Sequence, residues 1–259
     1  MLALSFFCIY PSPLVYMKVD NSIAFFEKIK AMTEKAWEEI DPADEYGPRI
    51  PPGAKWNRGL TEEELKQFEQ DMGFEFPLPL RNFYRTMNGL DKVDTWVDEH
   101  NVHHYFTPFY AYPRDLDRIY SMISWIYEST GVNSEIVKAS GISRIFPVWQ
   151  HRFIMIDNPG HPILSMHGSD IIFYGATLAR NFIADHFDHR FGNDVRLKFP
   201  PIRGYSWKGW VVPFWYPGPR YRRRMLPRTT PYKGVLTKRF GKIKRKIIMD
   251  KLAMGRTKV

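Results

Sequence analysis

Two short runs carry side chains that could bind a metal ion. HNVHH holds His100, His103 and His104, and DHFDH (185–189) combines aspartate with histidine. A metal site needs about three or four such ligands to converge, and neither run contains HExxH or another spacing that forces convergence. We therefore predict a surface loop and a helix end there, with no metal ion and no cofactor.

Nucleophilic and phosphate-binding chemistry has weaker support. The single cysteine, Cys8, lies in the apolar opening segment, and no serine occupies a GxSxG elbow. GVNSEIVKASG lacks the glycines and the lysine placement of a phosphate-binding loop. The sequence therefore predicts a protein that is not an enzyme and has no small-molecule substrate. A single cysteine cannot form an intramolecular disulfide, which favours a reducing compartment, and we predict a cytoplasmic location.

The opening MLALSFFCIYPSPLVY is apolar but lacks the features of an export signal. No Lys or Arg precedes its apolar run, Pro11 and Pro13 interrupt it, and no small-residue cleavage site follows. MKVDNSIAFFEKIK is a more ordinary start for a soluble protein, so we expect Met17 to be the initiator. A signal peptide is the alternative.

The elements that must position any site are best marked after residue 60. Thr61 and Glu64 have the spacing of a capping box, in which each residue binds the other's backbone N–H. Leu65 and Phe68 then lie on one helical face. Gly73 follows where a left-handed residue ends a helix. The spacing predicts a helix between the capping box and this glycine.

A second helix is predicted after two prolines. Pro77 reopens the chain, and Pro79 suits a first helical turn because no N–H is needed there. Asn88-Gly89 marks the end of this helix. Its predicted core face consists of Leu80, Phe83, Tyr84 and Met87.

The remaining elements follow from periodicity. Helical spacing marks 18–40, 113–131 and 176–187, a Pro- and Gly-rich loop spans 41–59, and 91–112 has loose strand character. Four short strands are predicted at 144–149, 152–157, 162–167 and 170–175. Helices followed by a run of strands and a closing helix indicate an α+β domain.

Charge is distributed unevenly along the chain. Residues 220–259 contain 15 Lys or Arg and one acid, or +14, so the first 219 residues hold 37 − 15 = 22 bases and 28 − 1 = 27 acids, or −5. An acidic body therefore precedes a basic tail. The candidate anion-binding residues of the tail are Arg220, Arg222, Arg223, Arg224, Lys242, Lys244, Arg245 and Lys246.

The tail has several interpretations. Its cations could neutralise nucleic-acid phosphates while Trp215, Tyr221 and Tyr232 stack on bases. An amphipathic cationic helix could instead lie on an anionic membrane. The tail could also be a solvated extension, or it could dock on the acidic body.

Aromatic residues gather in the segment before the helix predicted at 113–131. We expect most of them to pack in the core. Any exposed ones are candidate interface anchors, because Trp and Tyr supply much of the binding energy at protein interfaces. Nearby acids would add negative charge. The candidate partner-binding residues are Trp96, Asp98, Glu99, Tyr105, Phe109 and Tyr110.

The order helix, GF-x-FP, helix ending in NG resembles the opening signature of the SUKH superfamily. That group includes fungal cell-wall regulators of Smi/Knr type and bacterial toxin-immunity proteins. FPVWQHRFIMID, PILSM and DIIFYGATLARNFI resemble the later strands and closing helix of the family, with Tyr174-Gly175 before that helix. Phe76 stands where Leu is commoner. The matching positions of the opening signature are Glu63, Leu65, Phe68, Gly73, Phe74, Pro77, Phe83, Asn88 and Gly89.

The resemblance covers residues 58–190. Two parts of the chain lie outside the resemblance. Residues 1–57 form a leader, a helix and a linker, and residues 191–259 form an aromatic, Pro-rich segment with the basic tail. The resemblance implies N-terminal helices packed on a mostly antiparallel or mixed sheet that a helix closes.

For function, the resemblance implies a protein-binding module without catalytic residues or a cofactor. In the immunity branch the partner would be a cognate toxin domain, and an acidic body suits a basic partner. Two alternatives remain. One is a regulatory or scaffold protein of Smi/Knr type, and the other is a nucleic-acid-binding protein that uses its tail.

Overall fold

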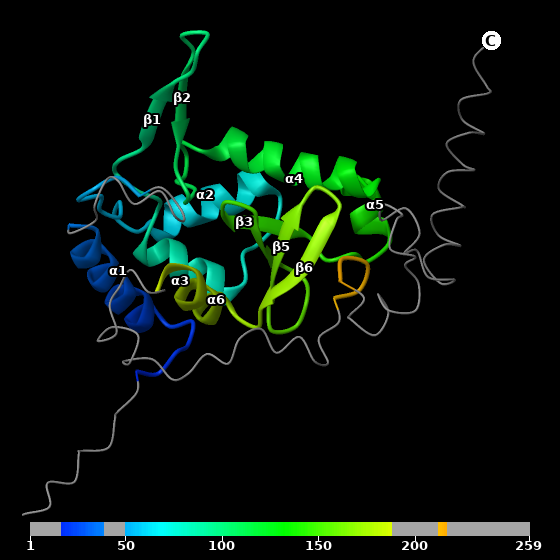
Figure 1. Cartoon of the computed structure of the whole chain (residues 1–259). Helices are drawn as coiled ribbons and strands as arrows, with labels where there is room; N and C mark the ends of the chain where they lie inside the picture. The colour runs from blue at the N-terminus through cyan, green and yellow to red at the C-terminus, as the bar shows by residue number, and fades with distance from the viewer. Residues whose placement is uncertain (1–16, 39–49, 188–211, 217–259) are drawn as a thin grey trace, which may run out of the picture.

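The computed structural model describes residues 17–38, 50–187 and 212–216. The opening segment 1–16 and the predicted tail cations from Arg220 onward lie outside these ranges. The element order confirms the α+β class (Figure 1). The helices are α1 (Ile23–Trp37), α2 (Glu62–Met72), α3 (Leu78–Thr86), α4 (Leu116–Thr130), α5 (Ser134–Ala139) and α6 (Leu178–His186). The strands are β1 (Asp94–Val97), β2 (His103–Phe106), β3 (Ile145–Trp149), β4 (Arg152–Met155), β5 (Ile163–His167) and β6 (Asp170–Gly175).

Strands β3 to β6 form one antiparallel sheet in sequence order. Short turns join neighbouring strands, so that Trp149 pairs with Arg152 and His167 pairs with Asp170. The four predicted strands are thus confirmed to within about two residues. Strands β1 and β2 form a separate hairpin that stands out from the body in Figure 1.

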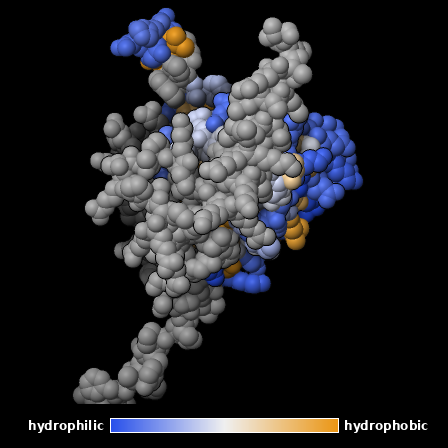
Figure 2. Space-filling view, turned by 90° about the vertical axis from the view of Figure 1, so that its right-hand side faces the viewer, coloured by the Kyte–Doolittle hydropathy of each residue, from blue (hydrophilic) through white to orange (hydrophobic). Residues whose placement is uncertain are grey.

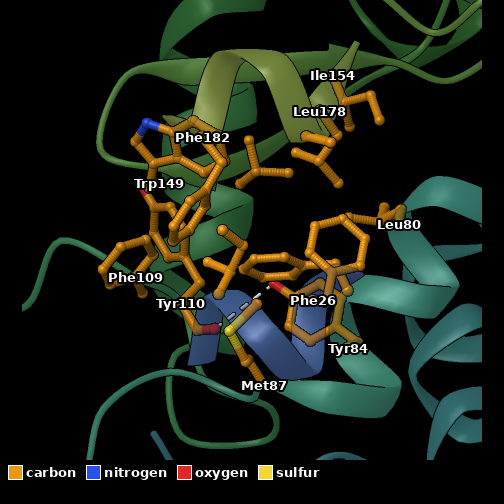
Figure 3. Close-up of a cluster of buried hydrophobic side chains, with 14 of the residues drawn as sticks. Phe26, Leu80, Tyr84, Met87, Phe109, Tyr110, Trp149, Ile154, Leu178 and Phe182 are labelled. Atoms are coloured by element: carbon orange, nitrogen blue, oxygen red, sulfur yellow. Dashed lines mark hydrogen bonds between the residues drawn. The ribbon is translucent and has the colours of Figure 1, made fainter. Parts of the chain in front are cut away.

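Side chains at alternate strand positions point to opposite faces of the sheet, and each face packs into its own hydrophobic core. Phe146 and Ile154 enter the first core, with α1, α2, α3 and α6. Ile145 and Phe153 enter the second core, with the C-terminal half of α4 and with α5. Figure 3 shows the first core, to which α1 contributes Phe26. Each such fully buried side chain contributes roughly 1.5–3 kcal/mol.

The turn between α2 and α3 is fixed by the residues that the sequence marks. Thr61 Oγ1 accepts the Glu64 N–H at 3.3 Å, and the Thr61 N–H donates to Glu64 at 2.9 Å, which confirms the capping box. Gly73 ends α2 with a φ of 73°. The buried Glu69 carboxylate, which was not predicted, accepts the Phe76 N–H at 2.7 Å. Polar groups therefore hold the whole GF-x-FP turn.

The Asn-Gly pair after α3 is a clamp for a distant segment. The Asn88 side chain donates to the Tyr112 carbonyl at 2.7 Å and accepts the Tyr112 N–H at 2.8 Å. Gly89 has a φ of 67°, and a Cβ there would lie 2.6 Å from the Cβ of Ala111. The motif thus seats residues 111–112 against the end of α3.

The Tyr-Gly pair at the end of β6 also permits a close approach. A Cβ on Gly175 would lie 2.7 Å from the Cβ of Asn181 in α6. The Tyr174 ring stacks on the Arg152 guanidinium at 3.6 Å. Glycine at 175 therefore lets α6 turn back tightly beside the sheet.

Two parts of the described chain differ from expectation. No helix was predicted in GVNSEIVKASG, the segment that was weighed and rejected as a phosphate-binding loop. It forms the short helix α5, which Asn133 caps by accepting the Ile136 N–H at 2.8 Å. Trp215, proposed to stack on bases, is instead buried in the second core. Its indole N–H donates to the Ser143 carbonyl at 2.7 Å, and its ring stacks on Tyr127 with centroids 6.1 Å apart. It is therefore unavailable to a nucleic acid.

Substituting the two signature glycines should separate backbone strain from crowding. Gly73→Ala places a side chain at positive φ with no atom within 4 Å, so we expect a loss of about 1 kcal/mol. Gly89→Ala adds the collision with Ala111, and overpacking should raise its loss by a further ~1–3 kcal/mol. Urea unfolding of the two variants measures both losses. Equal losses would contradict the clamp.

His151 should make stability depend on pH. Burial, then Arg152 and His167, lower the pKa of His151 from 6.5 to about 4. Between these values the unfolded chain binds the proton and the folded chain does not, so stability falls as pH drops through that window. We expect His151→Gln to flatten this decline in urea titrations, while the control His100→Gln should not.

The acids whose pKa values are lowered act in a separate range. Asp20, Glu62 and Glu64 have pKa values of about 2, because hydrogen bonds stabilise their carboxylates. The stability they contribute is present above their unfolded pKa values and is lost only as pH falls from about 4 toward 2. A decline that is unchanged in His151→Gln between pH values of about 6.5 and 4.5 would contradict the His151 assignment.

Candidate functional site: a projecting hairpin

The hairpin of β1 and β2 is the part of the described chain that stands furthest from the cores in Figure 1. Its strands are antiparallel, with Asp94 opposite Phe106 and Val97 opposite His103. Residues 91–112 were predicted to have loose strand character, and the hairpin is the form that this takes.

The turn of the hairpin is organised by Asp98. Its Oδ1 accepts the N–H groups of His100 and Val102, both at 2.9 Å. The Asn101 N–H donates to the Asp98 carbonyl at 3.0 Å, and Asn101 adopts a φ of 62°. Asp and Asn suit these positions because Asp binds nearby backbone N–H groups and Asn tolerates the left-handed region. The turn is therefore a defined structure.

Exposed apolar side chains are concentrated on this hairpin. Val97, Val102 and Tyr105 are 49%, 50% and 58% exposed, and they are three of the eight large apolar residues that lie exposed in the described ranges. Tyr105 pairs with the residue two positions before Val97, so both lie on one face of the hairpin. Figure 2 shows hydrophilic and hydrophobic side chains together on the projection at the top of the molecule.

The tip adds charge to this surface. The Glu99 side chain is 86% exposed and lies 3.7 Å from the His100 ring, which is 78% exposed. An ion pair at such exposure contributes little to stability. Both side chains are therefore available for contact with another molecule.

The buried carboxylate of Asp115, the N-cap residue of α4, holds both roots of the hairpin. Asp115 has no exposed side-chain surface and pairs with Arg114 at 2.9 Å and with Arg118 at 3.4 Å. Arg114 also donates to the Leu90 carbonyl at 3.0 Å, before β1, and Arg118 donates to the Thr107 carbonyl at 2.8 Å, after β2. One anion thus fixes where the chain leaves the body and where it returns.

The structure divides the candidate partner-binding residues. Glu99 and Tyr105 are exposed, Asp98 shapes the turn, and the Trp96 side chain lies outside the described atoms.

Phe109 and Tyr110 are core residues, which corrects their prediction as surface anchors. Phe109 is fully buried and packs on Trp56 with ring centroids 4.4 Å apart. The Tyr110 hydroxyl donates to the Gln150 carbonyl at 2.8 Å, and burial raises the pKa of Tyr110 to about 12. They are buried because the chain returning from β2 pairs Phe109 with Trp149 of β3, and Arg118 of α4 lies over the Tyr110 ring at 4.4 Å.

Comparison with protein families decides the classification. A family model described as the SMI1 / KNR4 family (SUKH-1) matches residues 59–191, about half of the chain. The chain belongs to this family. No curated protein and no solved structure matches it. The predicted SUKH resemblance is confirmed, and family membership points to protein–protein interaction in general.

The SUKH signature residues are mainly scaffold in this chain. Gly73 and Pro77 shape the α2–α3 turn, Asn88 and Gly89 seat the segment before α4, and Gly175 admits α6. Within the described ranges, no three His, Cys, Asp or Glu side chains group as metal ligands, and no helix is long and apolar enough to cross a membrane. The tail candidates from Arg220 to Lys246 lie outside the described residues.

Sequence reasoning missed Arg114, Asp115 and Arg118. The segment PRDLDR (113–118) was interpreted only as a helix start. Its signal was a pair of acids between two arginines, in a run that follows a proline and a conspicuous aromatic segment. Such a run also suits a solvated helix face, so only the fold shows that the acid is buried.

Removing the Asp115 charge should loosen the hairpin. We expect Asp115→Asn to lower the free energy of unfolding by about 3 kcal/mol, because it leaves the positive charges of Arg114 and Arg118 without their buried counter-ion. We also expect faster hydrogen exchange at the amides of β1 and β2 and at Thr107. The control is Asp117→Asn, two positions later in the first turn of α4 and exposed, which should change neither. Unchanged exchange in the Asp115 variant would show that the roots are held otherwise.

Proposed function

We propose that this chain is a protein-binding module without catalytic activity, which neutralises a toxin domain by binding it. The observation that carries the proposal is the projecting hairpin, whose exposed apolar face and acidic tip stand on roots fixed by Asp115. Family membership supports a role in protein–protein interaction.

The hairpin has the properties of a prepared contact surface. Its turn is closed by Asp98 and its roots by two arginines, so little conformational freedom remains to be lost on binding. Tyr105 offers a large, amphipathic side chain of the kind that dominates interface energetics. The charge of −5 on the first 219 residues would speed encounter with a basic partner.

A regulatory role of Smi/Knr type is the second candidate, because the matching family model is described by those proteins. Such a protein would use the same domain to hold a host partner. The two candidates differ in what the partner does in the cell, since a toxin harms the cell when it is unaccompanied.

Affinity capture followed by co-expression tests the proposal. The baits are the full chain and a chain ending at residue 219, which lacks 15 of the 37 Lys and Arg but keeps the buried Trp215. The lysate is treated with nuclease, and retained proteins are identified by mass spectrometry. We expect both baits to retain one protein that arrests growth when expressed alone and is harmless when co-expressed with this chain.

Other outcomes redirect the function. A harmless host protein retained by both baits would favour the regulatory role. Retention only by the full chain, lost after nuclease treatment, would assign binding to the basic tail and a nucleic acid. An enzymatic turnover of the retained protein by this chain would overturn the non-catalytic assignment.

Truncating Tyr105 should weaken binding of the retained partner. We expect Tyr105→Ala to raise Kd about tenfold in surface plasmon resonance, as loss of an interface anchor does. The control is Leu78→Ala, which removes a side chain of similar exposure (63%) from α3. Equal effects of the two variants would mean that the hairpin is not the contact.

A further inference from the structure

The charge of the hairpin is one-sided. Residues 94–106 contain Asp94, Asp98 and Glu99 and no Lys or Arg. Oδ1 of Asp98 is committed to the turn, where it accepts two backbone N–H groups. Glu99 is the next residue, and most of its side chain reaches solvent. The negative charge that a partner meets first is therefore that of Glu99.

The shape of the hairpin selects the shape of its partner. A four-residue strand rises about 13 Å, and the turn lies beyond it. The roots are hydrogen-bonded to Arg114, just before α4, and to Arg118 of α4, so the element is presented as a finger rather than a loose loop. A finger buries more surface in a depression than on a flat face.

The flank of the finger carries exposed apolar side chains. Val97 and Tyr105 share one face, and Val102 lies just past the turn. Apolar area of this kind gains free energy only where the partner also removes it from water. A receiving depression would therefore need a charged floor for the tip and an apolar wall for this flank.

We propose that the hairpin recognises a concave, cationic protein surface, in which Lys or Arg side chains receive Glu99 and an apolar wall packs on Val97 and Tyr105. This inference rests on the proposed function, since it describes the partner of the same binding module. Asp98 has a different role from Glu99, because it shapes the turn that presents the contact.

Charge variants of Glu99 in the full chain test the electrostatic part, with the protein retained in the capture experiment as ligand. We expect Glu99→Gln to weaken binding several-fold and Glu99→Lys at least tenfold, because reversal places like charges together. The control Glu63→Lys changes charge equally at an exposed position of α2 and should leave Kd within about twofold. Raising the salt concentration from about 0.05 to 0.5 M should raise the Kd of the native chain for its partner more than it raises the Kd of Glu99→Gln.

Carbodiimide coupling locates the contact directly. The reagent joins a carboxylate to an amine without a spacer, so we expect a Glu99–Lys link to the partner that disappears in Glu99→Gln. The linked lysine should lie in a depression of the partner. A link instead to a lysine of residues 220–259 in the same chain would overturn the inference by giving Glu99 an internal ligand.

The experiment distinguishes a failure of the cationic-depression inference from a failure of the proposed binding function. If no protein is retained by native chain or variants, the proposed function fails. If a protein is retained with Kd values that Glu99→Lys and Glu63→Lys change equally, the function stands and the cationic depression is overturned. Matching thermal unfolding of all variants excludes a folding defect as the cause.

Discussion

The buried carboxylate of Asp115 is the interaction on which the arrangement of this protein most depends. It carries a charge into a site without exposed surface, which is costly unless cations and N–H groups surround it. Arg114, Arg118 and the Ala111 N–H meet that need. The arginines have donors to spare, and these reach the carbonyls of Leu90 and Thr107. The contacts that stabilise this one anion therefore hold together α4, the segment around Ala111 and both roots of the hairpin.

The SUKH signature serves the same junction from the other side. Asn88 pairs with both backbone groups of Tyr112, and Gly89 leaves room for Ala111. The end of α3 and the start of α4 thus hold one short segment between them. A motif that reads as a simple helix stop is also the seat for a chain 20 residues or more away.

Local signals explain how much could be predicted from the sequence. The capping box, Gly73 and the four strands of the sheet were predictable because each depends on residues within a few positions. Most of the aromatic residues before α4 were expected in the core, but that Phe109 and Tyr110 are among them was not predictable, because the segment has no clear periodicity to separate buried from exposed positions. The role of Asp115 also escaped prediction, since its partners at 90 and 107 are brought near only by the fold. Of the candidate site, Glu99 and Tyr105 are exposed as binding requires.

The anchoring of Trp215 has a consequence for the 15 cations that begin at Arg220. Tyr216, the last described residue of that segment, lies four positions before Arg220, a contour of at most about 14 Å. The basic tail is therefore tethered at a defined point on the body rather than at the end of a long linker. Anything that holds both the tail and the body gains from a high effective concentration, so two weak contacts can act together as one strong one.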